Sequence, residues 1–311
     1  MSIPVKAENL SKWYGQVAGI LNVDLQITGG VVGLLGPNGA GKTTFMRLLT
    51  GQLRPSAGEV SLFGAPVWNN LAVMARIGYS PEHDGTWDEL TGREFVRLCC
   101  RMSGMNAQQG DKAADEAIAK VTMEQAADRR IRTYSKGMRQ RIKLAQAVAH
   151  DPDLIILDEP LTGCDPVVRA HIMELVRELG RQGKTILVSS HILHEVEAVT
   201  HQIVLLYKGQ VLATGDIHGL RDLIDEHPHR IEIACREPRT LAVAMTAQES
   251  VRSVTVGEQS LTLETDKPDA CYTELMQTVV DQSLQVDAIT SPDDNLEAVF
   301  RYLTNRSATG V

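Results

Sequence analysis

One stretch constrains this 311-residue chain more than any other, because its glycines, lysine and threonine follow the spacing G-x-x-x-x-G-K-[ST]. The stretch reads Gly36-Pro37-Asn38-Gly39-Ala40-Gly41-Lys42-Thr43-Thr44. The apolar run Val31–Leu35 precedes it and predicts a buried parallel strand, and Phe45–Leu49 follows it and predicts the start of a buried helix. A strand, a glycine-rich turn and a helix in this order are the setting in which a phosphate-binding loop occurs.

The chemistry of such a loop follows from its residue types. The glycines let the backbone bend so that successive N–H groups converge on phosphate oxygens at the positive end of a helix. Lys42 then reaches the β- and γ-phosphates, and the Thr43 hydroxyl can ligate Mg²⁺. The alternative is a glycine-rich turn with an incidental lysine, which does not account for Lys-Thr at this offset. The sequence therefore predicts a nucleoside triphosphate site.

Two carboxylates follow a second apolar run. Leu154–Leu157 predicts a central strand, and Asp158 and Glu159 come directly after it. Ligands of open α/β sheets bind at the carboxyl ends of the strands. We expect Asp158 to hold Mg²⁺ through water and Glu159 to orient and deprotonate an attacking water molecule. Two exposed turn carboxylates are the alternative.

Two further residues are weaker candidates when taken alone. His191 ends the predicted strand Thr185–Ser190, and a histidine there is more often a structural residue than a catalytic one. Tyr14 is expected in a loop, Lys12–Gly15, where its ring could stack on a nucleotide base or simply occupy a turn.

A basic segment precedes the predicted strand at Leu154. The sequence Tyr134-Ser135-Lys136-Gly137 opens a predicted helix whose apolar positions recur at helical spacing. Seven basic residues and no acidic one lie in this segment: Arg129, Arg130, Arg132, Lys136, Arg139, Arg141 and Lys143. A solvated basic face and a nucleic-acid contact are both alternatives, but the Ser-x-Gly loop at a helix start favours a phosphate.

The pattern of elements predicts an α/β fold with two domains. We expect one domain over residues 1–217, with a helical insertion over about 82–151. The remainder, 218–311, predicts the order β-α-β-β-α-β of a small, ferredoxin-like α+β domain, with a last helix over Leu296–Leu303. No catalytic group stands out in it.

Composition limits the possible functions. A net charge of −8 argues against a protein that coats nucleic acid or anionic lipid with its whole surface. Five cysteines without a C-x-x-C pair indicate neither a zinc site nor a disulfide framework, which is typical of a reducing cytosol. No apolar run approaches the ~18 residues of a membrane span, and Met1–Pro4 begins no signal peptide. Any membrane role is therefore expected to be peripheral.

Taken together and in order, these motifs resemble the ATP-binding subunits of ABC transporters over roughly residues 4–217. The resemblance implies a phosphate-loop ATPase core with a helical subdomain, and ATP and Mg²⁺ as ligands. It assigns ATP phosphates to Gly36–Thr44, with Lys42 catalytic, and adenine stacking to Tyr14. Ser135 and Gly137 would belong to the signature usually written Leu-Ser-Gly-Gly-Gln.

The resemblance also gives roles to the residues at the strand ends. Asp158 would bind the metal, Glu159 would be the catalytic carboxylate, and His191 would contact the γ-phosphate. Asp165 would lie in a loop between two subunits. Glu82 stands where a glutamine is expected, and it would either approach the metal or point toward the insertion and a permease.

Within the family, Tyr134–Arg141 and the tail Leu296–Thr304 are similar to subunits that partner ABC-2 type permeases. Lys136 in place of glycine and Glu82 both occur in that group, whereas Cys164 replaces a leucine. The resemblance implies the energising ATPase of an ABC-2 type exporter. Such a subunit works as a homodimer on a membrane permease, as a peripheral protein at the cytoplasmic face of the cell membrane, without nucleic acid.

Other functions are compatible with parts of the pattern. The ATPase of a binding-protein-dependent importer would differ only in its permease. A soluble translation factor of the ABC type carries two cassettes in one chain, and this chain has one. A DNA-maintenance ATPase would interrupt the fold with long coiled coils, and no sustained heptads occur here.

Overall fold

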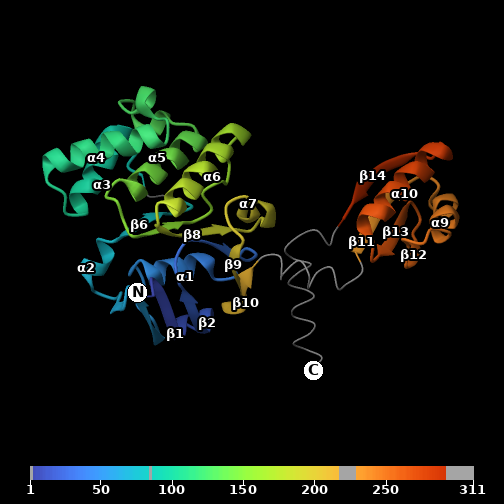
Figure 1. The fold of residues 1–311 in the computed structure, drawn as a ribbon, viewed down its shortest axis with the longest axis horizontal. Helices are drawn as coiled ribbons and strands as arrows, with labels where there is room; N and C mark the ends of the chain where they lie inside the picture. Colours follow the sequence, from blue (N-terminus) through green and yellow to red (C-terminus); the bar gives the residue numbers. More distant parts are fainter. Residues whose placement is uncertain (1–2, 84–85, 217–228, 292–311) are drawn as a thin grey trace. The chain divides into compact units, whose positions relative to one another are not determined.

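The computed structural model describes residues 3–83, 86–216 and 229–291. The chain divides into two compact units, Met1–Asp216 and Ile217–Val311 (Figure 1). The first unit contains, in chain order, β1 (Val5–Tyr14), β2 (Val17–Ile27), β3 (Val31–Leu35), α1 (Lys42–Leu49), β4 (Ala57–Leu62), β5 (Ala65–Pro66), α2 (Leu71–Met74), β6 (Ile77–Ser80), α3 (Gly92–Met102), α4 (Ala107–Lys120), α5 (Lys136–Val148), β7 (Leu154–Leu157), α6 (Pro166–Arg181), β8 (Thr185–Ser190), α7 (Leu193–Glu197), β9 (Gln202–Tyr207) and β10 (Gln210–Asp216).

Two sheets and two groups of helices form layers in this unit. One sheet has the order β2-β1-β4-β5 and is antiparallel, and the other has the order β10-β9-β3-β8-β7-β6. In the second sheet β9, β3, β8, β7 and β6 run parallel. Helix α1 lies between the two sheets, whereas α3 to α6 cover the opposite face of the larger sheet (Figure 1). The phosphate loop thus begins inside the protein.

The central strands follow from their composition. All four residues of β7 and all six of β8 are buried. Near-continuous apolar runs are typical of parallel strands that are covered on both faces. One apolar core joins α1 to both sheets, and a second packs α3 to α6 against the larger sheet.

Polar residues mark where the helices begin. Thr91 and Glu94 form a reciprocal capping box at the start of α3. Asp165 caps α6 by accepting the N–H groups of Val167 and Val168, and Pro166 occupies the first turn. Helices α3, α4 and α5 occur between β6 and β7, as the predicted helical insertion requires.

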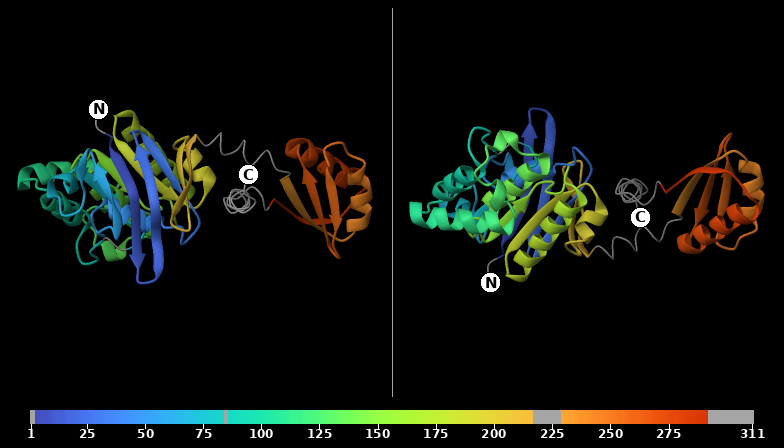
Figure 2. Two further views of the ribbon diagram at one scale, coloured as in Figure 1. Left: turned by 90° about the horizontal axis from the view of Figure 1, so that it is seen from below. Right: turned by 90° about the horizontal axis from the view of Figure 1, so that it is seen from above.

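The predicted loop at Lys12–Gly15 is wrong. Strand β1 continues through Tyr14 and pairs Trp13 with Ala18 and Tyr14 with Val17, so that only Gly15 and Gln16 form the turn. Trp13 and Tyr14 are good strand formers, and a two-residue hairpin needs no longer loop. The long β1–β2 hairpin is clear in Figure 2.

The second unit has the predicted order of elements. It contains β11 (His229–Cys235), α9 (Pro238–Thr246), β12 (Ser253–Val256), β13 (Ser260–Thr265), α10 (Pro268–Asp281) and β14 (Val286–Thr290). Its sheet has the order β12-β13-β11-β14, and each neighbouring pair is antiparallel. This is the split βαβ arrangement of a ferredoxin-like domain, with its own apolar core. The predicted helix Leu296–Leu303 lies outside the described residues.

Across the described residues, we find no helix with both the length and the apolar character that crossing a bilayer requires.

Candidate functional site

The phosphate loop joins the carboxyl end of β3 to the start of α1. It borders an open cleft of about 300 Å³ that is lined by Val17–Gly19, Pro37–Thr44, Glu82, Asp158 and Glu159. Helix α1 starts at Lys42 after the N-cap residue Gly41, and among the described residues none caps this helix with its side chain. N–H groups at a helix start without a side-chain partner can bind phosphate oxygens, which is the role that the sequence predicts for this loop.

At two positions of the loop, only glycine fits sterically. A β-carbon at Gly36 would lie 2.5 Å from the carbonyl oxygen of Leu206. Gly41 has a φ of 107°, and a β-carbon there would lie 2.5 Å from the carbonyl oxygen of Gly19. A side chain at either position would push the loop away from its neighbouring strands.

Lys42 is a buried cation folded back over the loop. Its Nζ donates to the carbonyl oxygens of Gly36 and Pro37, at 2.6 Å and 3.4 Å. The same Nζ lies 3.4 Å from Oε1 of Glu159. A buried ammonium with these neighbours provides a fixed positive charge at the edge of the cleft.

Asp158 is held by two hydroxyl groups. Oδ2 accepts from the Thr43 hydroxyl at 2.9 Å, and Oδ1 accepts from the Ser189 hydroxyl at 2.7 Å. The Asp158 side chain is 1% exposed. The Thr43 and Asp158 oxygens converge at the cleft, and hydroxyl and carboxylate oxygens are ligands that suit Mg²⁺. These two residues therefore fit a magnesium ion beside the phosphate loop.

Glu159 has a strained backbone and two basic neighbours. Its φ of 48° lies in the left-handed region, which costs a non-glycine residue of the order of 1–3 kcal/mol. Its N–H donates to the Ser189 hydroxyl oxygen at 2.8 Å, which fixes the turn. Oε2 lies 3.0 Å from Nδ1 of His191, while Oε1 faces Lys42. This carboxylate therefore has a fixed orientation toward the cleft.

Glu82 lies in the segment that leaves β6 for the helical insertion. It lines the cleft, and its Oε2 lies 3.4 Å from Nδ1 of His83. Lys143 of α5 donates to the backbone carbonyl oxygens of both Pro81 and Glu82 at 2.7 Å. Burial lowers the pKa of the Lys143 ammonium, which the charge of Glu82 partly opposes. The Glu82 backbone is thus tied to α5, the helix that begins at Lys136.

Tyr14 lies beside the cleft at the end of β1. Its ring is 46% exposed, its hydroxyl oxygen lies 3.5 Å from Oγ1 of Thr44, and Nζ of Lys12 lies 5.8 Å from its centroid. An exposed ring next to the phosphate loop can stack on a base. The Tyr14 ring therefore lies at the end of strand β1, and not in a loop as we expected.

Ser135 and Gly137 are not brought to this cleft. Ser135 caps α5 by accepting the N–H of Met138 at 3.3 Å, and among the described residues neither Ser135 nor Gly137 lines the cleft. One chain therefore does not unite the phosphate loop with the Ser-x-Gly loop.

The basic residues near α5 mostly have partners within the chain. Arg130 and Arg132 pair with Glu89, and Arg139 pairs with Asp88. Arg141 donates to Thr122, and Lys143 to the carbonyls described above. Acidic residues far away in sequence therefore neutralise much of the positive charge of this segment. The expected attraction of anions is confined to the Ser-x-Gly loop, Ser135–Gly137.

Sequence reasoning missed Ser189, which contacts Asp158 and Glu159. It also missed Arg169 and Glu195, which contact Cys164 and Ser190 beside the site. Ser189 precedes His191 at the carboxyl end of β8, so the rule that pointed to Asp158 could have found it. Arg169 and Glu195 are 26 positions apart and form an ion pair at 3.1 Å. No local spacing indicates such a pair.

Comparison with known proteins agrees with this geometry. A family model described as "ABC transporter" matches residues 20–162. The chain is 32% identical over 305 residues to the Daunorubicin resistance ATP-binding protein DrrA3 of Streptomyces coeruleorubidus, covering 96% of this chain and 95% of that protein. It is 33% identical over 309 residues to the Nod factor export ATP-binding protein I of Mesorhizobium japonicum, covering 98% of this chain and 88% of that protein.

Solved structures resemble the first unit. A bacterial ABC transporter cassette solved as a dimer superposes with a TM-score of 0.64 at 25% identity. The superposition covers 68% of this chain and 98% of that one.

The position of Tyr14 generates a first prediction. Tyr14→Ala should weaken nucleotide binding by roughly 1–3 kcal/mol, similarly for ATP and GTP, because every base presents a face for stacking. Affinities from a fluorescent-nucleotide competition assay measure this loss. Trp13→Ala is the matched control, because neighbouring strand residues point to opposite faces. A loss confined to ATP would show a specific polar contact instead of stacking.

The position of Glu82 generates a second prediction. Its carboxylate adds negative charge beside Asp158 and Glu159, and a bound cation offsets the resulting repulsion of phosphates. We expect ATP binding to depend more strongly on Mg²⁺ in the wild-type chain than in Glu82→Gln. Titration of Mg²⁺ at fixed ATP measures this, with Glu89→Gln as a control carboxylate outside the cleft. Superimposable curves for wild type and Glu82→Gln would place Glu82 outside the environment of the metal.

Proposed function

We propose that this chain powers an ABC-2 type exporter. The chain belongs to the ATP-binding proteins of ABC transporters, which are ATPases that couple the hydrolysis of ATP to transport. The observation that supports this proposal is the length of the match. The drug-resistance and Nod-factor-export relatives align with both units of the chain, whereas the solved dimeric cassette aligns with 68% of it. The second unit is therefore a feature shared with proteins whose names describe resistance and export.

We infer the reaction from the cleft. The N–H groups at the start of α1 and the Lys42 ammonium bind the β- and γ-phosphates of ATP. Magnesium, held by Thr43 and Asp158, would neutralise the charge that develops on the phosphates. Glu159 orients the attacking water and accepts its proton. His191 holds that carboxylate in place, with Nδ1 3.0 Å from Oε2 of Glu159. It would also contact the γ-phosphate.

We propose that two copies of the chain complete each site. Ser135 and Gly137 lie away from the cleft of their own chain, and the dimeric structure of a related cassette supports an arrangement of two subunits. In a head-to-tail pair, the N-terminus of α5 from one copy would face the ATP phosphates bound by the other. ATP then closes the pair, and hydrolysis opens it.

The proposed partner is an integral membrane permease of the ABC-2 type. The described residues contain no helix that could span a membrane, so the translocation path would come from that separate protein. The chain would bind the permease as a peripheral protein at the cytoplasmic face of the cell membrane, through the helical insertion that starts near Glu82.

The proposal predicts which permease accompanies the chain. The tagged full-length chain, isolated from detergent-solubilised membranes of its native host, should retain an ABC-2 type permease, identified by mass spectrometry. A chain truncated after Asp216 should no longer retain the permease if the second unit contributes to docking. Stable association with the permease of a binding-protein-dependent importer would contradict the exporter assignment.

The same truncation tests the second unit in dimer formation. The chain that ends at Asp216 retains every residue of the cleft, so its ATP affinity should be unchanged. Its ATPase activity should require a higher protein concentration if the second unit stabilises the dimer. Wild-type concentration dependence together with wild-type permease retention would leave the second unit without either role.

The proposed catalytic roles predict different effects for two substitutions. Glu159→Gln should retain ATP binding but lower turnover by about 10²–10⁴, the usual contribution of a general base. Lys42→Ala should instead weaken ATP binding, because Lys42 contacts the phosphates in the ground state. Single-turnover hydrolysis and equilibrium binding separate the two effects. Unchanged turnover in Glu159→Gln would refute its role as the base.

A further inference from the structure

We propose that Arg169 and Glu195 are a positioning pair that links the loop ending at Asp165 to the backbone on both sides of His191. Neither side chain lines the ATP cleft. The inference rests on the roles proposed for Glu159 and His191 in hydrolysis, and it does not depend on which substrate the transporter moves.

Arg169 joins two segments through different nitrogens of one guanidinium. It lies in the first turns of α6, where its N–H donates to the carbonyl oxygen of Asp165 at 2.9 Å. Nε donates to the carbonyl oxygen of Cys164 at 3.1 Å, and a terminal nitrogen donates to Oε1 of Glu195 at 3.1 Å. A planar guanidinium can make both bonds together, which a lysine ammonium on a flexible stem does less well.

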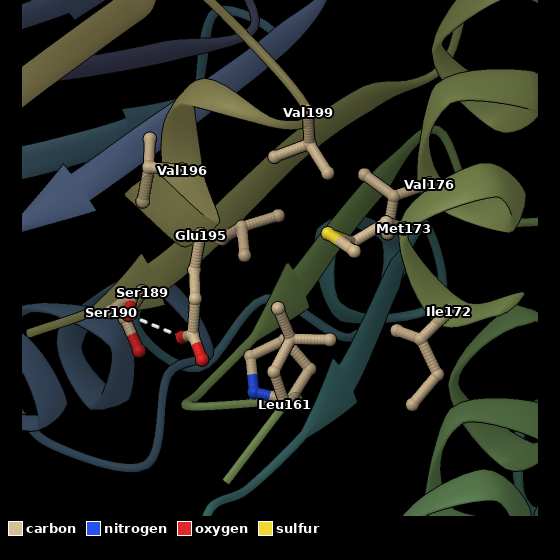
Figure 3. A pocket seen from close by; sticks show the side chains of 11 residues that line it. Leu161, Ile172, Met173, Val176, Ser189, Ser190, Glu195, Val196 and Val199 are labelled. Atoms are coloured by element: carbon tan, nitrogen blue, oxygen red, sulfur yellow. Dashed lines mark hydrogen bonds between the residues drawn. The ribbon is translucent and has the colours of Figure 1, made fainter. Parts of the chain in front are cut away.

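Glu195 transmits this contact to the histidine segment. Its Oε2 accepts from the Ser190 hydroxyl at 2.9 Å, and the Ser190 hydroxyl oxygen accepts from the N–H of Ile192 at 3.0 Å. Ser190 and Ile192 are the two neighbours of His191 in the chain. The Ser190–Glu195 hydrogen bond appears as the dashed line in Figure 3. The backbone at His191 is thus fixed from both sides by one hydroxyl, which Glu195 orients.

The surroundings of Glu195 make its two partners important. The side chain is 7% exposed and lies at one side of a small pocket between α6 and α7. Aliphatic side chains form most of the pocket wall, among them Leu161, Ile172, Met173, Val176 and Val199 (Figure 3). A carboxylate in such surroundings is stable only when it is paired and hydrogen-bonded. The pair therefore has one favoured arrangement, which is what accurate positioning of His191 requires.

Arg169→Lys tests the proposal in the full-length chain. The lysine can keep the ion pair with Glu195, but its single nitrogen cannot also reproduce the bond from Nε to Cys164. We expect kcat for ATP to fall roughly 10-fold, because displacement by about 1 Å at a reacting centre can cost about 10²-fold. KM should stay within about twofold, since the contacts of the phosphate loop and Lys42 to ground-state ATP are intact.

Arg177→Lys is the matched control on the same helix. Arg177 has the same kind of contacts, because its Nε donates to the carbonyl oxygen of Ala198 at 2.8 Å and a terminal nitrogen donates to Glu174 at 2.8 Å. Among the described residues, its hydrogen-bond partners lie outside the segment Ser190–Ile192. Arg177→Lys should therefore retain wild-type kcat. An equal fall of kcat in both variants, or a wild-type kcat in Arg169→Lys, would overturn the proposal.

Ser190→Ala provides a second, independent variant, because it leaves the ion pair intact and removes only the hydroxyl between Glu195 and Ile192. It should lower kcat as Arg169→Lys does, and the double variant should lose little more than either single one. Fully additive losses would mean that the residues act separately and would refute the link. Glu159→Gln, measured in parallel, shows whether the hydrolytic site itself is correctly assigned.

Discussion

The functional geometry depends on the parallel pairing of β3, β8 and β7. Strand β8 pairs with β3 on one side and with β7 on the other, so the three carboxyl ends meet at one edge of the sheet. The phosphate loop follows β3, the two carboxylates follow β7, and Ser189 and His191 come from the end of β8 and beyond it. Because all three strands are buried, their register cannot shift without exposing an apolar core. The sheet therefore holds charges from three distant parts of the sequence within hydrogen-bonding distance.

Bringing these charges together costs free energy, because like charges repel each other. The Ser189 hydroxyl reduces this cost. Asp158 and Glu159 are adjacent, buried carboxylates, which repel each other unless each has its own partners. Ser189 donates to the Asp158 carboxylate and accepts from the Glu159 N–H, and it thereby stabilises the left-handed turn that points the two side chains apart. Asp158 then faces Thr43, whereas Glu159 faces Lys42 and His191. One hydroxyl thus helps to give two neighbouring carboxylates separate environments.

The sequence predicted those parts of the site that short-range patterns encode. The phosphate loop was predictable because its glycines, lysine and threonine are contiguous, and Asp158 because it follows a run of four apolar residues. The extension of β1 through Tyr14 was missed, because Gly15 indicates a turn but does not fix where the turn begins. Trp13 and Tyr14 favour a strand, and pairing with β2 extends β1 to Tyr14. The neutralisation of the basic segment by Asp88 and Glu89, and the pair Arg169–Glu195, depend on tertiary contacts between residues 26 to 51 positions apart. Composition and periodicity contain no information on such contacts.

Helix α5 relates the proposed subunit contact to the metal-facing side of the cleft. Its N-terminus carries Ser135, which in the proposed dimer faces ATP held by the other copy. Two turns later Lys143 holds the carbonyls of Pro81 and Glu82, and Gln140 reaches the carbonyl of Glu159 at 3.4 Å. A helix is stiff along its axis, because each turn is hydrogen-bonded to the next. A displacement of α5 by a neighbouring subunit would therefore move the Glu82 segment and strain the Glu159 turn at the same time. The contacts of Lys143 and Gln140 are sufficient for both effects.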